Sequence, residues 1–192
     1  MRRLWYYYIY LLIVWSFFRY FIRLPEVIEE LWFKPLLWLV PLFWWGLSLK
    51  ERISMFGGKL MMSIGYGIVL GLVYVVLITR FNLLVDWLNV NLVGVAVATA
   101  ITEELAFSGF VAGYLEKIKK GNWTNLLMVG LMVAVIRLPI LIFVYKLGVV
   151  NLAGVFLFAG ASGVINAWIR VETGNVTGSI VARAMMNLAV LA

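Results

Sequence analysis

The stretch VNLVGVAVATAITEELAFSGFVAGY, residues 90–114, decides the fold. Before its two adjacent carboxylates, Glu103 and Glu104, its polar side chains are Asn91, Thr99 and Thr102. A run of this length and apolarity predicts a transmembrane helix. An acidic residue at the centre of such a helix costs about 2.5–3.5 kcal/mol on insertion, so we expect both glutamates to face a bundle interior or a polar cavity.

The composition places the whole chain in the membrane. Of the 192 residues, 65% are hydrophobic and 13% are charged, and cysteine and histidine are absent. Apolar segments of near-spanning length recur throughout, which predicts an all-α polytopic transmembrane bundle without a separate soluble domain. The absence of cysteine excludes disulfides. The net charge of +7 is explained by basic loops, and we expect no nucleic-acid partner.

The hydrophobic pattern predicts about seven helices, arranged as an N-terminal group over residues 1–89 (three spans) and a core over 90–192. The second of them holds Pro35 and Pro41, so we expect it to be kinked or partly interfacial. The expected helices are 4–18, 31–49, 60–79, 90–115, 123–145, 149–169 and 176 to the C-terminus. Gly67 and Gly71 have a spacing that lets helices pack closely, within the chain or, as the alternative, in a dimer.

The basic residues of the loops predict the orientation in the membrane. An excess of lysine and arginine marks the cytoplasmic side, which here favours a cytoplasmic N-terminus, nine basic residues against five. The cytoplasmic group is Arg2, Arg3, Lys50, Arg52, Lys59, Lys117, Lys119, Lys120 and Arg170, and the opposite group is Arg19, Arg23, Lys34, Arg80 and Lys146, offset by Glu26, Glu29 and Glu30. We therefore expect a multi-pass protein of the cell membrane.

Four charged residues then lie at membrane depth: Glu103, Glu104, Arg137 and Arg183. At 1.5 Å of rise per residue their depths overlap, which predicts one shared polar centre. Asn187 follows Arg183 by one helical turn and projects from the same face. Such a centre can simply hold helices together, or it can be a ligand or substrate site.

The residues around the glutamates carry a family resemblance. Glu103 and Glu104, followed by Leu-Ala-Phe-Ser108, resemble the Glu-Glu-x-x-x-Arg motif of the CPBP family, the glutamate intramembrane endopeptidases that include CAAX proteases of type II and bacteriocin-processing and immunity proteins. The segment Val133 to Pro139 is similar to the family's Phe-x-x-x-His-Leu-Pro. The segment Thr173 to Asn187 is similar to its Thr-Gly-Asn turn and His-x-x-x-Asn helix.

The departures from the family pattern bear on catalysis. Both positions at which the family has histidine are arginine, Arg137 and Arg183, and the position of the motif arginine is Ser108. The resemblance implies that Glu103 activates a water molecule, with Glu104, Arg137, Arg183 and Asn187 completing the catalytic set. Arginine can donate hydrogen bonds to an oxyanion, but it cannot take up a proton.

Three functions remain open at this point. The first is a CAAX-protease-like endopeptidase that cleaves membrane-associated peptides or proteins, retained or catalytically impaired as a pseudoenzyme. The second is a non-enzymatic protein, such as an immunity factor or a chaperone, that binds a peptide or lipid in a cavity retained from a proteolytic ancestor. The third is a small transporter, which the absence of a visible inverted repeat disfavours. We expect no cofactor and no metal, because two carboxylates and an amide beside two fixed cations make a poor zinc site.

Overall fold

The computed structural model describes residues 1–22, 24–44, 53–80 and 89–191, apart from the side chain of Glu26. The helices of this part are α1 (Arg2–Phe21), α2 (Glu26–Ile28), η1 (Glu29–Phe33), α3 (Lys34–Trp44), α5 (Leu60–Thr79), α6 (Val90–Glu104), η2 (Leu105–Val111), α7 (Ala112–Ile118), α8 (Trp123–Pro139), η3 (Ile140–Val144), α9 (Val149–Thr173) and α10 (Thr177–Leu191). The segments α2–η1–α3, α6–η2–α7 and α8–η3 are continuous helices.

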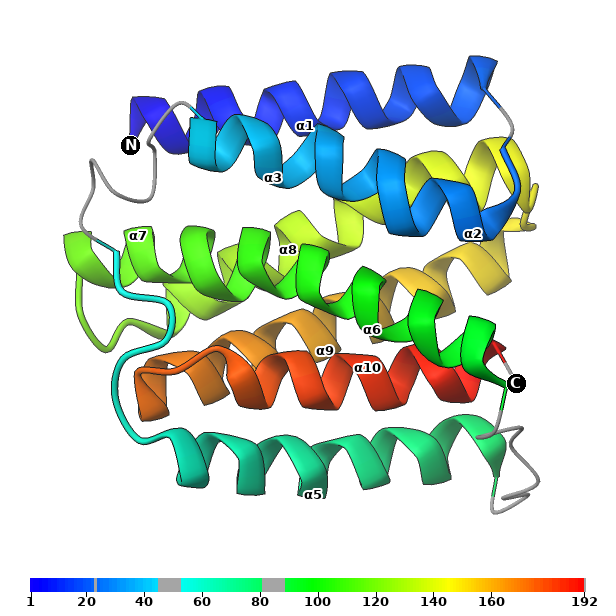
Figure 1. Ribbon diagram of the computed structural model, residues 1–192. Coiled ribbons are helices and arrows are strands. Elements are labelled where there is room, and N and C mark those ends of the chain that lie inside the picture. The colour runs from blue at the N-terminus through cyan, green and yellow to red at the C-terminus, as the bar shows by residue number, and fades with distance from the viewer. Residues whose placement is uncertain (23, 45–52, 81–88, 192) are drawn as a thin grey trace.

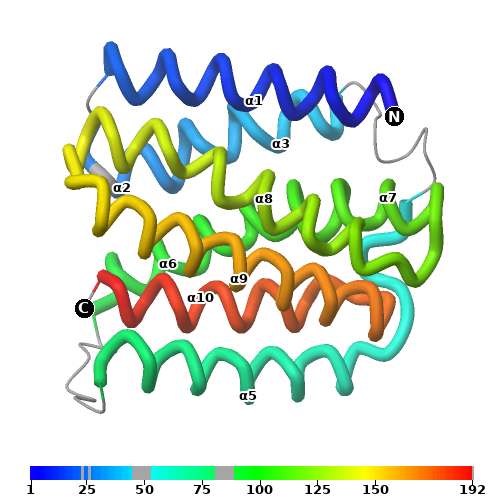
Figure 2. Tube along the Cα trace, turned by 180° about the vertical axis from the view of Figure 1, so that it is seen from behind, coloured from blue at the N-terminus to red at the C-terminus, as the bar shows by residue number. Residues whose placement is uncertain are grey.

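The helices lie roughly side by side in one bundle (Figure 1). Helices α1 and α3 form one edge and α5 forms the opposite edge, with the other long helices between them, as the view from behind confirms (Figure 2). Helix α10 packs against α5, α6 and α9, and α8 packs against α9 and α1. The first residue lies at one end of the bundle and residue 191 at the other (Figure 1).

The predicted fold class is confirmed: the described residues form an all-α bundle suited to a membrane. Four helices are long and apolar enough to cross a bilayer, at Leu60–Thr79, Val90–Ile118, Trp123–Val144 and Val149–Thr173, and Thr177–Leu191 is a shorter apolar helix. Helix α1 has twenty residues and α3 has eleven, but neither is among these four. The protein is therefore an integral membrane protein, and α3 is too short to count among these four helices.

Three of the described helices contain a π-helical segment. A π-helical segment, η2, begins directly after Glu104. Another, η3, begins directly after Pro139, whose ring removes one backbone donor from the helix. The expected irregularity of the second predicted helix lies in η1, just before Pro35, while Pro41 is contained within α3. Irregular winding of this kind shifts the faces on which the following side chains project.

Helices α5 and α10 approach each other through glycine. A Cβ atom at Gly67 would overlap the backbone of Gly178, and one at Gly71 would overlap the side chain of Met185. This close contact confirms the expectation that the Gly67–Gly71 spacing serves packing within the chain. Residues 45–49 of the second expected helix, and the basic residues Arg23, Lys50 and Arg52, lie outside the described residues.

Candidate functional site

Glu103 lies at the centre of a cluster of buried charges. Its Oε1 accepts a hydrogen bond from the ammonium group of Lys34 at 2.8 Å, and its Oε2 accepts one from the guanidinium of Arg137 at 2.6 Å. The Nε of Arg183 lies 3.7 Å from the same Oε2. The carboxylate of Glu103 is 9% exposed, so three cations from three helices neutralise it away from bulk water.

Glu104 is held separately, on the adjoining side of the same helix. Its Oε1 accepts hydrogen bonds from Arg183 Nε at 2.7 Å and from Asn166 Nδ2 at 2.8 Å. Its Oε2 accepts a hydrogen bond from the hydroxyl of Ser108, one turn later in η2. Arg183 also donates to Ser162 Oγ at 3.2 Å. Every one of these partners is buried, so Glu104 belongs to a sealed polar network.

The charged centre extends into the N-terminal helices, which corrects the sequence prediction. Lys34 also donates to Glu30 at 2.7 Å, and Glu30 accepts from Thr99 at 2.8 Å and from Arg19 at 3.3 Å. Arg19 in turn pairs with Glu29. The sequence analysis counted Arg19, Lys34, Glu29 and Glu30 among the charges at the membrane surface, but the structure buries all four. Arg170, also assigned to a loop, is buried and donates to the carbonyl of residue 54 at 3.0 Å.

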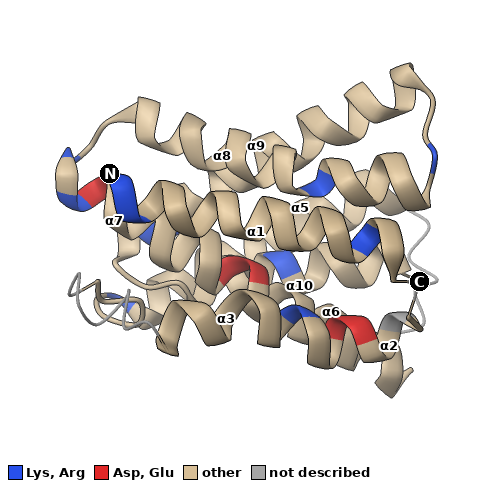
Figure 3. Cartoon of the chain, turned by 90° about the horizontal axis from the view of Figure 1, so that it is seen from above, with Lys and Arg blue, Asp and Glu red and all other residues tan. Residues whose placement is uncertain are grey.

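The error has a physical reason: opposite charges on neighbouring helices compensate each other. Four carboxylates (Glu29, Glu30, Glu103 and Glu104) face four cations (Arg19, Lys34, Arg137 and Arg183) in one connected cluster. A buried ion pair avoids the cost that either charge alone would have. Seen from above, charged residues occur inside the bundle as well as at its ends (Figure 3).

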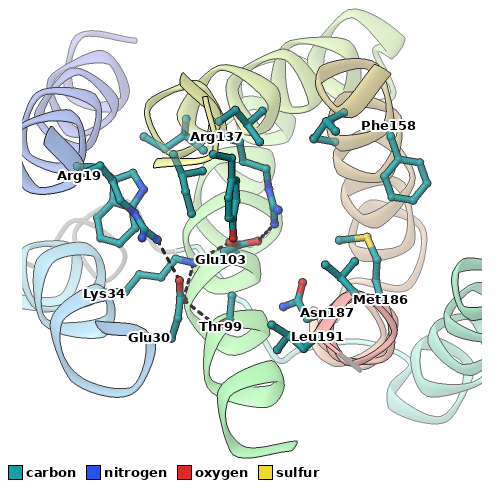
Figure 4. A pocket seen from close by; sticks show the side chains of 18 of the residues that line it. Arg19, Glu30, Lys34, Thr99, Glu103, Arg137, Phe158, Met186, Asn187 and Leu191 are labelled. Atoms are coloured by element: carbon teal, nitrogen blue, oxygen red, sulfur yellow. Dashed lines mark hydrogen bonds and ion pairs between the residues drawn. The ribbon is translucent and has the colours of Figure 1, made fainter. Parts of the chain in front are cut away.

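A cavity of about 470 Å³ lies beside Glu103, within the usual size range of small-molecule sites. Figure 4 shows Glu103 with Arg137 on one side and Lys34, Glu30 and Thr99 on the other, facing Asn187 and Met186 of α10. Its polar wall consists of Arg19, Glu30, Lys34, Thr99, Glu103, Arg137, Tyr145 and Asn187. The rest of the wall is mostly apolar and includes Trp15, Trp38, Ile136, Leu141, Phe158 and Leu191.

The sequence-predicted site residues divide into two groups. Glu103, Arg137 and Asn187 line the cavity, whereas Glu104 and Arg183 lie behind its wall. Asn187 donates to the carbonyl of Ala96 at 3.3 Å, so it is not paired with either glutamate. The structure thus brings both arginines to the glutamates but turns the guanidinium of Arg183, 1% exposed, away from the cavity.

The chemistry available at this centre is limited by its pairing. A carboxylate acts as a general base when a lone pair can reach the proton that it removes. Both oxygens of Glu103 already accept hydrogen bonds from cations. The described residues contain no cluster of three or more histidine, cysteine, aspartate or glutamate side chains that could hold a metal ion.

Sequence reasoning missed Lys34, Glu30 and Arg19 as site residues. One signal was present: Glu30 and Lys34 are four residues apart, the spacing of an intrahelical ion pair. Beginning the expected helix at Leu31 left Glu30 in the preceding loop and hid that spacing. The contact from Lys34 to Glu103, across 69 positions of sequence, had no local signal.

Comparison with known proteins gives the family. Searches of the curated proteins and of the solved structures returned no significant match. A family model described as type II CAAX prenyl endopeptidase Rce1-like matches residues 85–189. This segment covers more than half of the chain and holds Glu103, Glu104, Arg137, Arg183 and Asn187. The chain belongs to the Rce1-like family of type II CAAX prenyl endopeptidases, with an intramembrane-protease fold.

Proposed function

We propose that this protein is a non-hydrolytic member of its family, which binds a membrane-embedded ligand in the cavity beside Glu103. The observation that carries the proposal is the pairing of Glu103 with Lys34, Arg137 and Arg183. A carboxylate in contact with three cations is a poor base, because opposite charges stabilise its ionised form. Arginine cannot replace it as a proton acceptor.

The cavity supports a binding role. It has the volume of a small-molecule site and joins a few polar groups to a mainly apolar wall, which is the usual composition of such sites. The buried network behind it, from Glu104 to Arg183 and Asn166, holds the helices that form this wall. Such a protein keeps the family's fold and binds a ligand in the cavity without cleaving a peptide.

Retained proteolysis is the second candidate. Glu103, Arg137 and Asn187 all line the cavity, so a peptide carbonyl placed there would meet a carboxylate and two hydrogen-bond donors. Hydrolysis then requires that Lys34 or Arg137 leave Glu103 when substrate binds. Donors aimed at a developing oxyanion are a recognised means of catalysis.

We further propose a multi-pass location in the cell membrane with the N-terminus in the cytoplasm. Exposed basic residues gather at the end of the bundle where the chain begins, as expected for a cytoplasmic face. Those of the described part are Arg2, Arg3, Lys59, Lys117, Lys119 and Lys120. Labelling of single cysteines, introduced at Lys120 and at Lys146, with a membrane-impermeant reagent tests this orientation, because the chain has no native cysteine.

A proteolysis assay on the purified protein in bilayer nanodiscs tests the proposed function. The wild type and Glu103→Gln are incubated with a panel of membrane-associated peptides, prenylated and unprenylated, and products are identified by mass spectrometry. We expect no cleavage by either protein. Cleavage by the wild type that Glu103→Gln abolishes would overturn the proposal in favour of retained proteolysis.

A variant that restores the family residues sharpens this test. It combines Arg137→His, Arg183→His and Ser108→Arg, with and without Lys34→Met. Histidine titrates near neutral pH and can transfer protons, which arginine cannot. If the loss of these groups explains the inactivity, the variant that also lacks Lys34 gains cleavage, because all three native cations that contact Glu103 have then been replaced. Elution as a single folded species is the condition for interpreting a negative result.

A further inference from the structure

The wall of the main cavity carries an excess of positive charge. Its charged residues are three cations (Arg19, Lys34 and Arg137) and two carboxylates (Glu30 and Glu103). The remaining partners of the cluster, Glu29, Glu104 and Arg183, do not line this cavity. The eight charges balance over the whole cluster, but the surface that a ligand would meet has one more cation than carboxylates.

This excess is located at Arg137. Its side chain is 27% exposed, whereas those of Lys34 and Arg19 are 5% and 9% exposed. Lys34 bridges two carboxylates, and Arg19 pairs with two. Within the described part of the chain, Arg137 pairs with Glu103 alone, through one Nη atom. A guanidinium has five N–H donors, so most of those of Arg137, which lines the cavity, are not used by Glu103.

The rest of the wall favours a hydrocarbon chain over a peptide. A bound peptide brings one donor and one acceptor per residue, and each needs a partner when it is buried. Beyond the charged groups, the polar side chains of the wall are Thr99, Tyr145 and Asn187. Thr99 already donates to Glu30, and Asn187 uses one of its two amide N–H donors on the backbone of Ala96, so few groups remain for a peptide backbone. Leucine, isoleucine, valine and aromatic side chains form most of the remaining surface.

We propose that the cavity binds a single-chain amphiphile with an anionic head group, carboxylate or phosphate, whose head pairs with Arg137 and whose chain lies against Trp15, Trp38 and the apolar wall. This proposal rests on the proposed binding function and names its ligand class. Arginine pairs with carboxylate and phosphate through parallel N–H···O bonds, which gives specificity as well as affinity. Glu103 orients Arg137, the proposed partner of the head group, by accepting a hydrogen bond from one Nη of its guanidinium.

The proposal is tested by binding four probes with the same sixteen-carbon chain to the wild-type protein in an uncharged detergent. The probes are palmitate, hexadecyl phosphate, hexadecanol and hexadecyltrimethylammonium, and native mass spectrometry gives the bound fraction. Acetate and inorganic phosphate serve as probes without a chain. We expect the two anionic amphiphiles to bind about tenfold or more tightly than the alcohol, as a charge-assisted hydrogen bond allows. We expect the cation, acetate and phosphate not to bind measurably.

Substitutions in the cavity wall test whether the probes bind at Arg137 and against the two tryptophans. Arg137→Gln is expected to remove the preference for the anionic probes, and Arg137→Lys to retain part of it. Lys120→Gln is the matched control, because Lys120 is an exposed cation that does not line the cavity. A brominated palmitate should quench tryptophan fluorescence in the wild type and less so in Trp15→Phe/Trp38→Phe, since both rings line the cavity.

Equal binding of the alcohol and the anions would overturn the proposal, as would an unchanged preference in Arg137→Gln. Binding of membrane peptides without binding of any single-chain amphiphile would assign the cavity to a peptide instead. None of these outcomes depends on proteolysis. Failure of the ligand assignment is therefore distinguishable from failure of the proposed function.

Discussion

The N-terminal helices and the family-matched segment build the same charged centre from different kinds of sequence. The family-matched segment, residues 85–189, contributes Glu103, Glu104, Arg137 and Arg183 at motif positions. Helices α1 and α3, with η1, lie outside that match and contribute Arg19, Glu29, Glu30 and Lys34. Half of the eight charged residues of the cluster therefore come from a region without a recognisable motif.

The two regions also protect their charges differently. In the core, Glu104 and Arg183 are 2% and 1% exposed and are enclosed by hydrogen-bonding side chains. In the N-terminal region, the cations lie against aromatic rings: Arg19 is 4.5 Å from the ring centre of Trp15, and Lys34 is 5.3 Å from that of Trp38. We therefore expect the core charges to lack alternative partners when one residue is replaced. In the N-terminal region, each carboxylate that Lys34 contacts has another partner that remains.

The largest effect is expected in the core. Arg183→Met should lower the free energy of unfolding by about 3–5 kcal/mol, because it leaves a buried Glu104 without its cation. The double variant with Glu104→Gln should recover part of the loss. Steric trapping in bicelles measures both values. Strictly additive losses would show that the two side chains do not interact.

A smaller effect is expected where the two regions meet. Lys34→Met should cost about 1.5–3 kcal/mol, the worth of hydrogen bonds to charged groups. Glu103 keeps Arg137 and Arg183 in this variant, and Glu30 keeps Arg19 and Thr99. Lys59→Met, at an exposed position, is the control, with an expected change below about 0.5 kcal/mol. A loss at Lys34 as large as that at Arg183 would mean that the regions are equally rigid.

The smallest loss of stability is expected where α1 packs against α3 and α8. The hydroxyl of Tyr7 donates to the carbonyl of Trp38 at 2.9 Å, and that of Tyr8 donates to the carbonyl of Met132 at 3.0 Å. Phenylalanine at either position should cost about 0.5–1.5 kcal/mol, the usual net worth of a hydrogen bond. Tyr6→Phe, at a position 70% exposed, should be silent in the same unfolding measurement. Losses near zero at Tyr7 and Tyr8 would show that packing alone holds α1.

The sequence predicted the core of the fold closely, because its apolar runs have sharp ends. The run between Lys59 and Arg80 became α5, Leu60–Thr79, with the predicted bounds. The second helix was predicted to begin at Leu31, but helical structure begins at Glu26. Acidic residues there indicate a loop when each is considered alone. They are helical and buried because their cations arrive from other helices, which no local pattern shows.

The sequence predicted one polar centre but not the full extent of the charged cluster. The shared depth of Glu103, Glu104, Arg137 and Arg183 indicated one centre, and the structure places both guanidinium groups in contact with the glutamates. Depth along a helix says nothing about the rotation of a side chain around it. The sequence therefore did not show that Glu103 and Arg137 face the cavity while Glu104 and Arg183 lie behind its wall. Their roles in binding or catalysis stay predictions.

The glycine contact between α5 and α10 determines which wall of the cavity can move. Gly67 and Gly178 bring the two backbones so close that sliding one helix along the other would drive side chains into main-chain atoms. Helix α10, with Met186 and Asn187, is thus the fixed wall of the cavity. The opposite wall, which includes Trp15 and Trp38, is joined to Glu103 through the flexible side chain of Lys34. We expect a ligand to enter by displacing α1 and α3, which requires Lys34 to release Glu103. The contacts between Glu30 and Thr99 and between Tyr8 and Met132 must break as well.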